Sequence, residues 1–305
     1  KSIAEIIGKV DDILELVKPH ALLILGDTNS CLSVIPAKRR HIPVFHMEAG
    51  NRCFDQRVPE ELNRKIVDHI SDINLTYSDI SREHLLNEGI ASDRIIKTGS
   101  PMFEVLEFYK NEIKRSKVLQ KYNLEKYNYF VMSVHREENI EPSDSFEMLL
   151  KMISDLSKSF NKKIIISTHP RTRKRLDAVN KSFNPNVIFL KPLGFFDYVM
   201  LQKSAFVTLS DSGTISEESS ILNFPALNLR EAHERPEAME EGSVMMTGFN
   251  IGKIKDAINI LSDQERGRKR MLFSVSDYSK SNVSDKVLRI ILSYIDFINK
   301  KVWYN

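Results

Sequence analysis

The chain has 305 residues, of which 42% are hydrophobic and 28% charged, and this composition excludes a disordered or collagen-like polypeptide. The 44 basic and 41 acidic side chains leave a formal charge of +3, which is too small to indicate binding to nucleic acid or to an anionic membrane. Two cysteines exclude a disulfide framework, and no apolar run reaches the roughly 20 residues that span a bilayer, so we expect a cytoplasmic protein without membrane insertion.

The first part of the chain alternates between helical periodicity and short apolar runs. Strands are predicted at residues 21–25, 43–47 and 73–77, and helices at 3–18, from the polar turn at 26–30 to about 40, at 60–70 and at 78–88. The strands are apolar on both faces, which is typical of a buried parallel sheet with helical crossovers. Because such a domain opens with a strand, we expect a preceding N-terminal segment with the first strand.

A second α/β domain is predicted after a stretch rich in Lys, Asn and Glu at 110–128, which is the best domain boundary. Strands are predicted at 129–134, 164–168, 187–190, 206–209 and 225–229, and helices at 143–159, 171–182, 196–203, 214–222 and 284–300. The length also favours two domains, since one domain has about 150 residues. We expect domains at 1–112 and 113–283, with a helix at 284–305 that packs back toward the first domain.

Titratable side chains follow the predicted strands, where open α/β sheets bind their ligands. Asp27 and Glu48 stand at two such strand ends, and His135 follows a third. Asp27 could instead cap the next helix, and His135 could be a structural histidine. Glu60 follows Pro59 at a helix start, where the helix dipole alone favours a carboxylate. Glu48 follows an apolar run, so a buried charge there indicates a partner or a function.

The segment 210–218 predicts an anion site. A strand ends at a turn of small residues around Ser212 and Gly213, and the following helix exposes free N–H groups at its start. Glu218 lies one turn along, where a carboxylate could reach ribose hydroxyls, and Arg230 and Arg235 would suit a diphosphate. A plain capped helix is the alternative interpretation.

Several other chemistries lack their motifs. The sequence has no Walker loop and no Gly-x-Gly-x-x-Gly, which speaks against ATP hydrolysis and dinucleotide redox chemistry. It has no His-x-x-x-His or Cys-x-x-Cys spacing, so no metal site is predicted, and no Gly-x-Ser-x-Gly elbow for a serine nucleophile.

The sequence resembles the non-hydrolysing UDP-N-acetylglucosamine 2-epimerases from residue 1 to about residue 250. Six motifs stand in the order seen in that family: Gly26-Asp27-Thr28, His46-Met47-Glu48-Ala49-Gly50, Pro59-Glu60-Glu61-Leu62-Asn63-Arg64, His135-Arg136-Glu137-Glu138-Asn139, Ser210-Asp211-Ser212-Gly213 and Glu234-Arg235-Pro236-Glu237. The run 46–61 is most similar to the branch that interconverts UDP-2-acetamido-2,6-dideoxy-L-talose and UDP-N-acetyl-L-fucosamine in capsule and O-antigen synthesis.

The resemblance implies an α/β fold of two Rossmann-like doubly wound domains flanking a cleft, as in GT-B glycosyltransferases, with the N-terminal domain incomplete. It implies elimination of UDP across C1 and C2 to give a bound 2-acetamidoglycal, followed by re-addition of UDP and reprotonation of C2 on the opposite face. It implies a UDP-N-acetyl amino sugar as substrate, a homodimer, and neither a cofactor nor a metal. Epimerisation between UDP-GlcNAc and UDP-ManNAc is the alternative, and glycosyl transfer is the rival class.

The resemblance also implies a set of site residues. The catalytic ones are Asp27, Glu48, Glu60 and His135, the last near the diphosphate or the reacting ring. Ser212 and Gly213 match the diphosphate-binding turn, Glu218 the ribose ligand and Tyr198 the aromatic that packs on uracil; Arg136 and Arg235 complete the UDP-binding set. His169 and Arg171 are candidates for an allosteric UDP-sugar site or for a supporting place behind the catalytic residues. Thr214 departs from the family, which usually has a glycine there.

Overall fold

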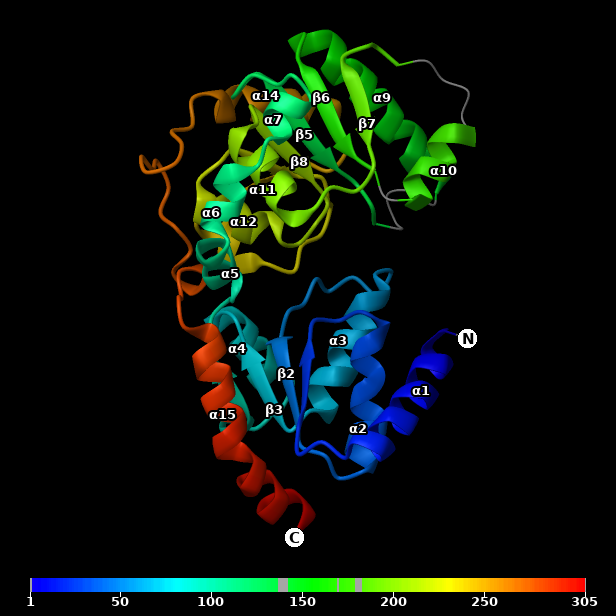
Figure 1. The fold of residues 1–305 in the computed structure, drawn as a ribbon, viewed down its shortest axis with the longest axis vertical. Helices are drawn as coiled ribbons and strands as arrows, with labels where there is room; N and C mark the ends of the chain where they lie inside the picture. Colours follow the sequence, from blue (N-terminus) through cyan, green and yellow to red (C-terminus); the bar gives the residue numbers. More distant parts are fainter. Residues whose placement is uncertain (1, 137–141, 169, 179–182, 305) are drawn as a thin grey trace. The chain divides into compact units, whose positions relative to one another are not determined.

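The computed structural model describes residues 2–136, 142–168, 170–178 and 183–304 (Figure 1). The chain divides into two compact units, which we call unit 1 and unit 2. Unit 1 consists of Lys1–Glu104 together with Ser276–Asn305, and unit 2 consists of Val105–Val275. The end of the chain therefore belongs to the same unit as its beginning.

Unit 1 is built on a four-stranded parallel sheet in the order β1-β2-β3-β4. The strands are β1 (Leu22–Leu25), β2 (Val44–Ala49), β3 (Ile73–Thr76) and β4 (Ile95–Lys97). The connections contain η1 (Asn29–Ser33) with α2 (Val34–Arg39), then α3 (Pro59–Ile70), and then α4 (Asp79–Asn87) with η2 (Ser92–Arg94). Because all strands are parallel, their carboxyl ends lie on one edge of the sheet.

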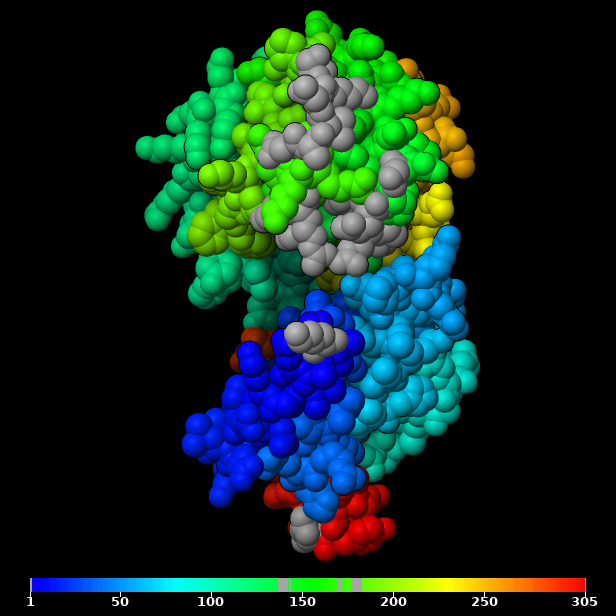
Figure 2. Space-filling model, turned by 90° about the vertical axis from the view of Figure 1, so that its right-hand side faces the viewer, coloured from blue at the N-terminus to red at the C-terminus, as the bar shows by residue number. Residues whose placement is uncertain are grey.

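Helices cover both faces of this sheet, as its apolar strands require. Successive strand residues point to opposite faces, so Val44 packs with α1 (Ser2–Val17), α2 and α3, whereas Phe45 and Met47 pack with α15 (Val283–Ile298). Figure 1 shows α15 beside β3 and the first three helices on the opposite face. Helix α1 lies on the outer surface of unit 1 in Figure 2.

Unit 2 has a six-stranded parallel sheet in the order β10-β9-β8-β5-β6-β7. The strands are β5 (Tyr129–Ser133), β6 (Lys163–Ser167), β7 (Val187–Leu190), β8 (Val207–Ser210), β9 (Ala226–Asn228) and β10 (Met245–Met246). The chain builds outward from β5 in one direction through β7 and then continues with β8 on the other side of β5. The carboxyl ends of β5 and β8 therefore form a topological switch point, where doubly wound sheets bind ligands.

The helices of unit 2 also cover both faces of their sheet. α9 (Ser143–Phe160) and α14 (Ile251–Ser262) pack with Phe130 and Ile164, whereas α11 (Phe195–Ser204) and α7 (Val118–Lys121) pack with Val131. Among the described residues, the unit also contains α6 (Lys110–Arg115), α10 (Pro170–Ala178), α12 (Ile215–Leu222) and α13 (Pro236–Glu240), with most of α5 (Met102–Phe108). The fold thus places two polar strand edges, one in each unit.

Most predicted elements are confirmed within a few residues, and the misses are short or late elements. The sequence reasoning did not find β4, β10, α5, α6, α7, α13 or α14, and α6 and α7 lie in the stretch 110–128 that it assigned to a domain boundary. It predicted a helix to residue 182, of which Pro170–Ala178 is observed and 179–182 fall outside the described residues. No helix in the described part of the chain is long and apolar enough to cross a membrane.

Candidate functional site

The carboxyl edge of the unit 1 sheet carries all three carboxylates that the sequence proposes as catalytic. Asp27 follows β1, Glu48 lies near the end of β2, and Glu60 is the second residue of α3. Each of the three is half-buried, and β2, which carries Glu48, is otherwise buried. The sheet thus presents these carboxylates at its edge without sealing them from a ligand.

Glu48 has an unusual backbone conformation. Its φ is 68°, in the left-handed region that non-glycine residues rarely adopt. The register between β2 and β3 shifts between Met47 and Ala49, so Glu48 is the extra residue of a β-bulge. A bulge re-aims the side chain, and bulges are over-represented next to active sites.

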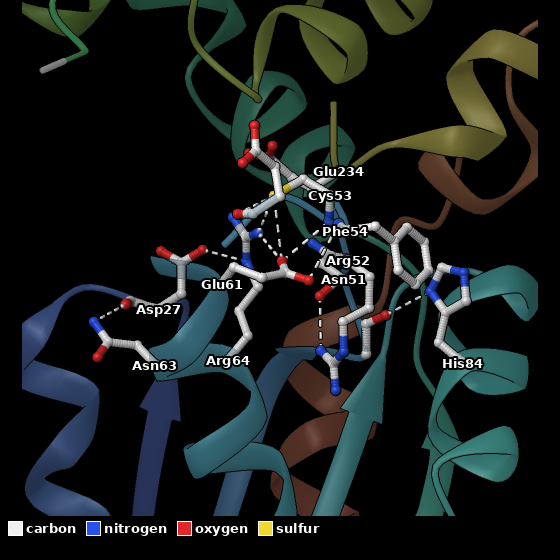
Figure 3. Close-up of polar contacts among 12 residues, drawn as sticks. Asp27, Asn51, Arg52, Cys53, Phe54, Glu61, Asn63, Arg64, His84 and Glu234 are labelled. Carbon is white, nitrogen blue, oxygen red and sulfur yellow. Dashed lines mark hydrogen bonds and ion pairs between the residues drawn. The ribbon is translucent and has the colours of Figure 1, made fainter. Parts of the chain in front are cut away.

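Asp27 is held by two residues of α3. Arg64 Nε donates to Asp27 Oδ2 at 2.7 Å, and Asn63 Nδ2 donates to the Asp27 carbonyl at 2.9 Å (Figure 3). The Arg64 side chain is 2% exposed and that of Asp27 is 21% exposed. The ion pair therefore reaches from the interior to a carboxylate that stays accessible.

Glu61, directly beside Glu60, has a different environment. Its carboxylate is buried, accepts hydrogen bonds from the N–H groups of Cys53 and Phe54 at 3.0 and 3.2 Å, and pairs with Arg64 at 2.9 Å (Figure 3). Burial alone would raise the pKa of Glu61, but the bonds from Cys53 and the Arg64 guanidinium outweigh it and lower the pKa. Glu61 therefore fixes the loop after β2, while Glu60 remains half-buried.

A buried network of ion pairs and hydrogen bonds lies next to the carboxyl edge of the unit 1 sheet. Asp68 accepts from Arg52 Nη1 at 2.7 Å and from the Gly50 N–H at 3.2 Å, and it pairs with His46 Nδ1 at 2.7 Å. Arg52 also forms two bonds of 2.7 Å with Glu88, which lower the pKa of Glu88 to about 2. His46 is 1% exposed and both of its ring nitrogens form hydrogen bonds, so it is a core histidine.

In unit 2, Asp211 organises the switch point between β5 and β8. Its carboxylate is fully buried and accepts the N–H groups of His135 and Arg136, each at 3.0 Å from Oδ2. His135 Nδ1 lies 3.0 Å from Oδ1, and the His135 side chain is 46% exposed. The two strand ends are thus tied together while the imidazole remains accessible.

The turn that precedes α12 has the geometry of an anion site. Ser212, Gly213 and Thr214 are half-buried, and the hydroxyls of Ser212 and Thr214 lie 3.0 Å apart. A Cβ at Gly213 would come within 2.8 Å of Glu234 Oε1, so any larger residue would require the Glu234 carboxylate to shift. The first N–H groups of a helix have no intrahelical partner and favour an anion.

Buried ion pairs surround this turn. Glu234 pairs with Arg136 at 3.0 Å and also with Arg230, and Arg235 pairs with Glu217 at 3.1 Å. All but Arg136 among these five side chains are at most 5% exposed. Arg235, which the sequence predicts as a UDP-binding residue, is therefore buried inside the unit and paired with Glu217 of α12.

Glu218 and Tyr198 lie behind the same turn. Glu218 is 7% exposed and accepts from Gln202 Nε2 at 2.6 Å; burial raises the pKa of Glu218 to about 7. Burial also raises the pKa of Tyr198, with Glu218 adding to the rise, against hydrogen bonds with Ser133 and Ser210 that lower it. The Tyr198 hydroxyl thus points to the ends of β5 and β8.

The structure brings the predicted residues together in two groups, one in each unit. Asp27, Glu48 and Glu60 share the edge of unit 1, and the predicted UDP-binding residues gather with His135 around the switch point of unit 2. His169 lies outside the described residues, and only the backbone of Arg171 is described, in α10. Sequence reasoning missed the supporting roles of Glu61, Arg64 and Asp211, although all three stand inside the quoted motifs.

Metal ligation has no candidate in the part of the chain that the structure describes. Among those residues, no group of three or more His, Cys, Asp or Glu side chains is arranged to hold a metal ion.

Known proteins resemble the chain over nearly its whole length. The family model of UDP-N-acetylglucosamine 2-epimerase matches residues 1–292. The UDP-N-acetylglucosamine 2-epimerase of Methanocaldococcus jannaschii is 32% identical over 292 residues, which cover 93% of this chain and 78% of that protein.

Solved structures agree with this similarity. A UDP-N-acetylglucosamine 2-epimerase structure from Rickettsia bellii matches with a TM-score of 0.94 and 49% identity, covering 100% of this chain and 81% of that one. The M. jannaschii UDP-GlcNAc 2-epimerase in complex with UDP-GlcNAc and UDP matches with a TM-score of 0.86 and 30% identity, covering 96% and 80%. These matches confirm the α/β fold with two parallel sheets, of the GT-B-like kind. The chain belongs to the UDP-N-acetylglucosamine 2-epimerase family, a family of isomerases.

Proposed function

We propose that the chain epimerises C2 of a UDP-2-acetamido sugar by eliminating UDP and adding it back. The observation that carries the proposal is that each unit holds one of the two kinds of site that this reaction needs. One unit presents accessible carboxylates at a sheet edge, and the other presents a helix N-terminus at a switch point. Proton transfer needs the first kind of site and a diphosphate leaving group needs the second.

The reaction balances without a redox partner. A carboxylate takes the proton from C2, the C2–H electron pair forms the C1–C2 double bond, and the C1–O bond breaks to release UDP as an anion. The diphosphate oxygen of UDP then adds to C1 of the 2-acetamidoglycal while C2 receives a proton on the opposite face. Because an unactivated C2–H is a weak acid, base and leaving-group stabilisation are needed together.

We assign the proton chemistry to Glu48 and Glu60. Both carboxylates are half-buried at the sheet edge, whereas Asp27 Oδ2 is engaged by Arg64 at 2.7 Å. We therefore give Asp27 the task of orienting the substrate or stabilising charge. His135 would act at the diphosphate or the sugar ring, where its 46% exposed side chain is accessible.

We assign UDP binding to unit 2. The N–H group of Gly213 and the hydroxyl of Ser212 would hold the diphosphate, with Arg136 and Arg235 adding positive charge. Glu218 would accept from the ribose hydroxyls and the ring of Tyr198 would pack on uracil. The buried pairs around Gly213 support this role, because they hold the turn in one conformation before the ligand arrives.

As substrate we propose UDP-2-acetamido-2,6-dideoxy-L-talose, converted to UDP-N-acetyl-L-fucosamine. The sequence of residues 46–61 supports this branch, and the structure adds Phe54, which is 74% exposed and stands edge-on to His84 at 5.3 Å (Figure 3). An exposed aromatic ring at this edge suits the methyl group of a 6-deoxy sugar better than a hydroxymethyl group. UDP-GlcNAc is the competing substrate, since relatives carry that name.

The decisive experiment is solvent exchange. The chain is incubated in D2O with each UDP-sugar in turn, and proton NMR follows deuterium incorporation at C2 and the appearance of the epimer. We expect exchange with the 6-deoxy-L-talo substrate at a higher kcat/KM than with UDP-GlcNAc. Exchange with UDP-GlcNAc alone would overturn the branch assignment, and exchange with neither would overturn the epimerase proposal.

A further inference from the structure

The backbone of Glu48 needs support from its surroundings. With φ at 68° in a β-bulge, this residue is in an unfavourable backbone conformation that persists only where neighbouring contacts fix it. A strained backbone aims the Glu48 carboxylate, but three side-chain torsions remain that could turn it away. A second element must therefore fix the carboxylate itself.

Asn51 is in position to fix it. Its Nδ2 donates to Glu48 Oε1 at 3.3 Å, and its Oδ1 accepts from Ser81 Oγ at 3.0 Å. The Asn51 side chain is 1% exposed, so its amide has no competing water. The reverse amide orientation would set Oδ1 against the carboxylate of Glu48, which repels it; the arrangement therefore has one favoured direction.

The start of α4 holds Asn51 in turn. Ser78, the N-cap of α4, accepts from the Ser81 N–H at 3.2 Å, and its hydroxyl lies 3.1 Å from that of Ser81. Both serines are at most 1% exposed. The hydroxyl of Ser81 is thereby positioned to donate to Asn51 Oδ1, and the polar chain ends as a donor toward Glu48.

The backbone packs tightly at the same place. A Cβ at Gly50 would collide with the Ser81 carbonyl, so only glycine permits this approach of α4 to the strand end. His84 Nδ1 also donates to the Gly50 carbonyl, at 2.9 Å. Gly50 and Asn51 thus form two hydrogen bonds with α4, from His84 and from Ser81, and these bonds fix the end of β2 against the helix.

We propose that Asn51 is a positioning residue of the reaction, whose buried amide, oriented by Ser81, holds the Glu48 carboxylate in the conformation that exchanges the C2 proton. This inference rests on the proposed function. It deepens that function by naming a residue outside the six motif roles, acting through Glu48 and without contact to the sugar. Productive alignment of a general base is worth orders of magnitude in rate, and a misplacement of about 1 Å is costly.

The test uses three variants that change the Asn51 amide or its partner Ser81. Asn51→Leu keeps the approximate volume and removes the donor to Glu48, and Asn51→Asp keeps the shape but places a second carboxylate against Glu48. Ser81→Ala keeps the amide and removes the hydroxyl that orients it. We expect kcat for C2 exchange to fall about 10- to 100-fold for Asn51→Leu, more for Asn51→Asp, and about 3- to 10-fold for Ser81→Ala. KM in the exchange assay and the UDP affinity from calorimetry should each change less than threefold.

A matched control distinguishes positioning from general structural damage. Asn74 is a fully buried asparagine of β3 whose Nδ2 donates to the Asp68 carbonyl at 2.9 Å. Asn74→Ala should lower the free energy of unfolding at least as much as Asn51→Leu, with kcat within about threefold of wild type. Equal kcat losses in the two variants, or a normal kcat in Asn51→Leu, would overturn the proposal. If wild type exchanges no UDP-sugar, the proposed function fails instead.

Discussion

The two polar sheet edges of this protein differ in how far their carboxylates are buried and paired. At the edge of unit 1, Asp27, Glu48 and Glu60 stay half-buried above a buried ionic layer. At the switch point of unit 2, Asp211 and Glu217 are buried and already paired. A group that must gain and lose a proton has to remain accessible and only partly neutralised, whereas an anion-binding turn works best when its dipoles are fixed in advance.

The largest expected effect tests the accessible edge with two adjacent residues. Glu60→Gln should lower the rate of C2 exchange by about 10²- to 10⁴-fold and leave UDP affinity within a few-fold, because it removes a proton-transfer group and no diphosphate contact. Glu48→Gln should behave in the same way. The D2O assay and calorimetry with UDP measure the two quantities.

Glu61→Gln provides the control. The substitution weakens the pairing with Arg64 and the hydrogen bonds that the carboxylate accepts from two N–H groups. It should therefore lower the free energy of unfolding by about 1–3 kcal/mol. Its turnover loss, per folded molecule, should be smaller than that of Glu60→Gln. A larger turnover loss in Glu61→Gln than in Glu60→Gln would show that the buried carboxylate, and not the accessible one, transfers the proton.

The next effect concerns the buried edge and its pH dependence. The pKa of Glu218 is raised to about 7, so the folded protein keeps this proton in a range where the unfolded chain, with a pKa near 4.5, has lost it. The folded state binds more protons, and stability therefore declines as pH rises from about 4.5 through 7. At most about 3 kcal/mol is lost in this way, since one pKa unit corresponds to about 1.4 kcal/mol.

Glu218→Gln should remove this decline. Urea unfolding of both proteins at pH 5, 6, 7 and 8 should show the variant gaining relative to wild type as pH rises, with the gain levelling off above pH 7. A constant difference across this range would mean that Glu218 is ionised throughout, and the contrast between the two edges would be weaker than proposed.

The sequence predicts most of this fold because its strands are apolar on both faces. β1, β2 and β3 lie where that pattern places them, and so do β5 to β9. β4 and β10 are too short to show a pattern, with three and two residues. α14 had a usable signal that was overlooked, since Ile251, Ile254, Ile258 and Leu261 recur at helical spacing.

The site was harder to predict than the fold. The sequence brings Glu60 and Glu61 to the same helix start, and both suit the helix dipole. Only the structure separates them, because tertiary contacts with Cys53 and Arg64 engage one and leave the other half-buried. The left-handed conformation of Glu48 is equally invisible in sequence, since glutamate has no preference for it.

The smallest effect tests whether the turn of unit 2 binds by its hydroxyl or by its shape. Ser212→Ala should lower UDP affinity about 3- to 10-fold, the value of one hydrogen bond, and leave kcat for C2 exchange nearly unchanged. Thr214→Val is the comparison, because the hydroxyls of Ser212 and Thr214 lie 3.0 Å apart and each helps to orient the other. If Ser212 contacts the diphosphate directly, Thr214→Val should weaken UDP binding less than Ser212→Ala. Equal losses in calorimetry would mean that the pair only shapes the turn, and that the backbone N–H groups of the helix start hold the anion.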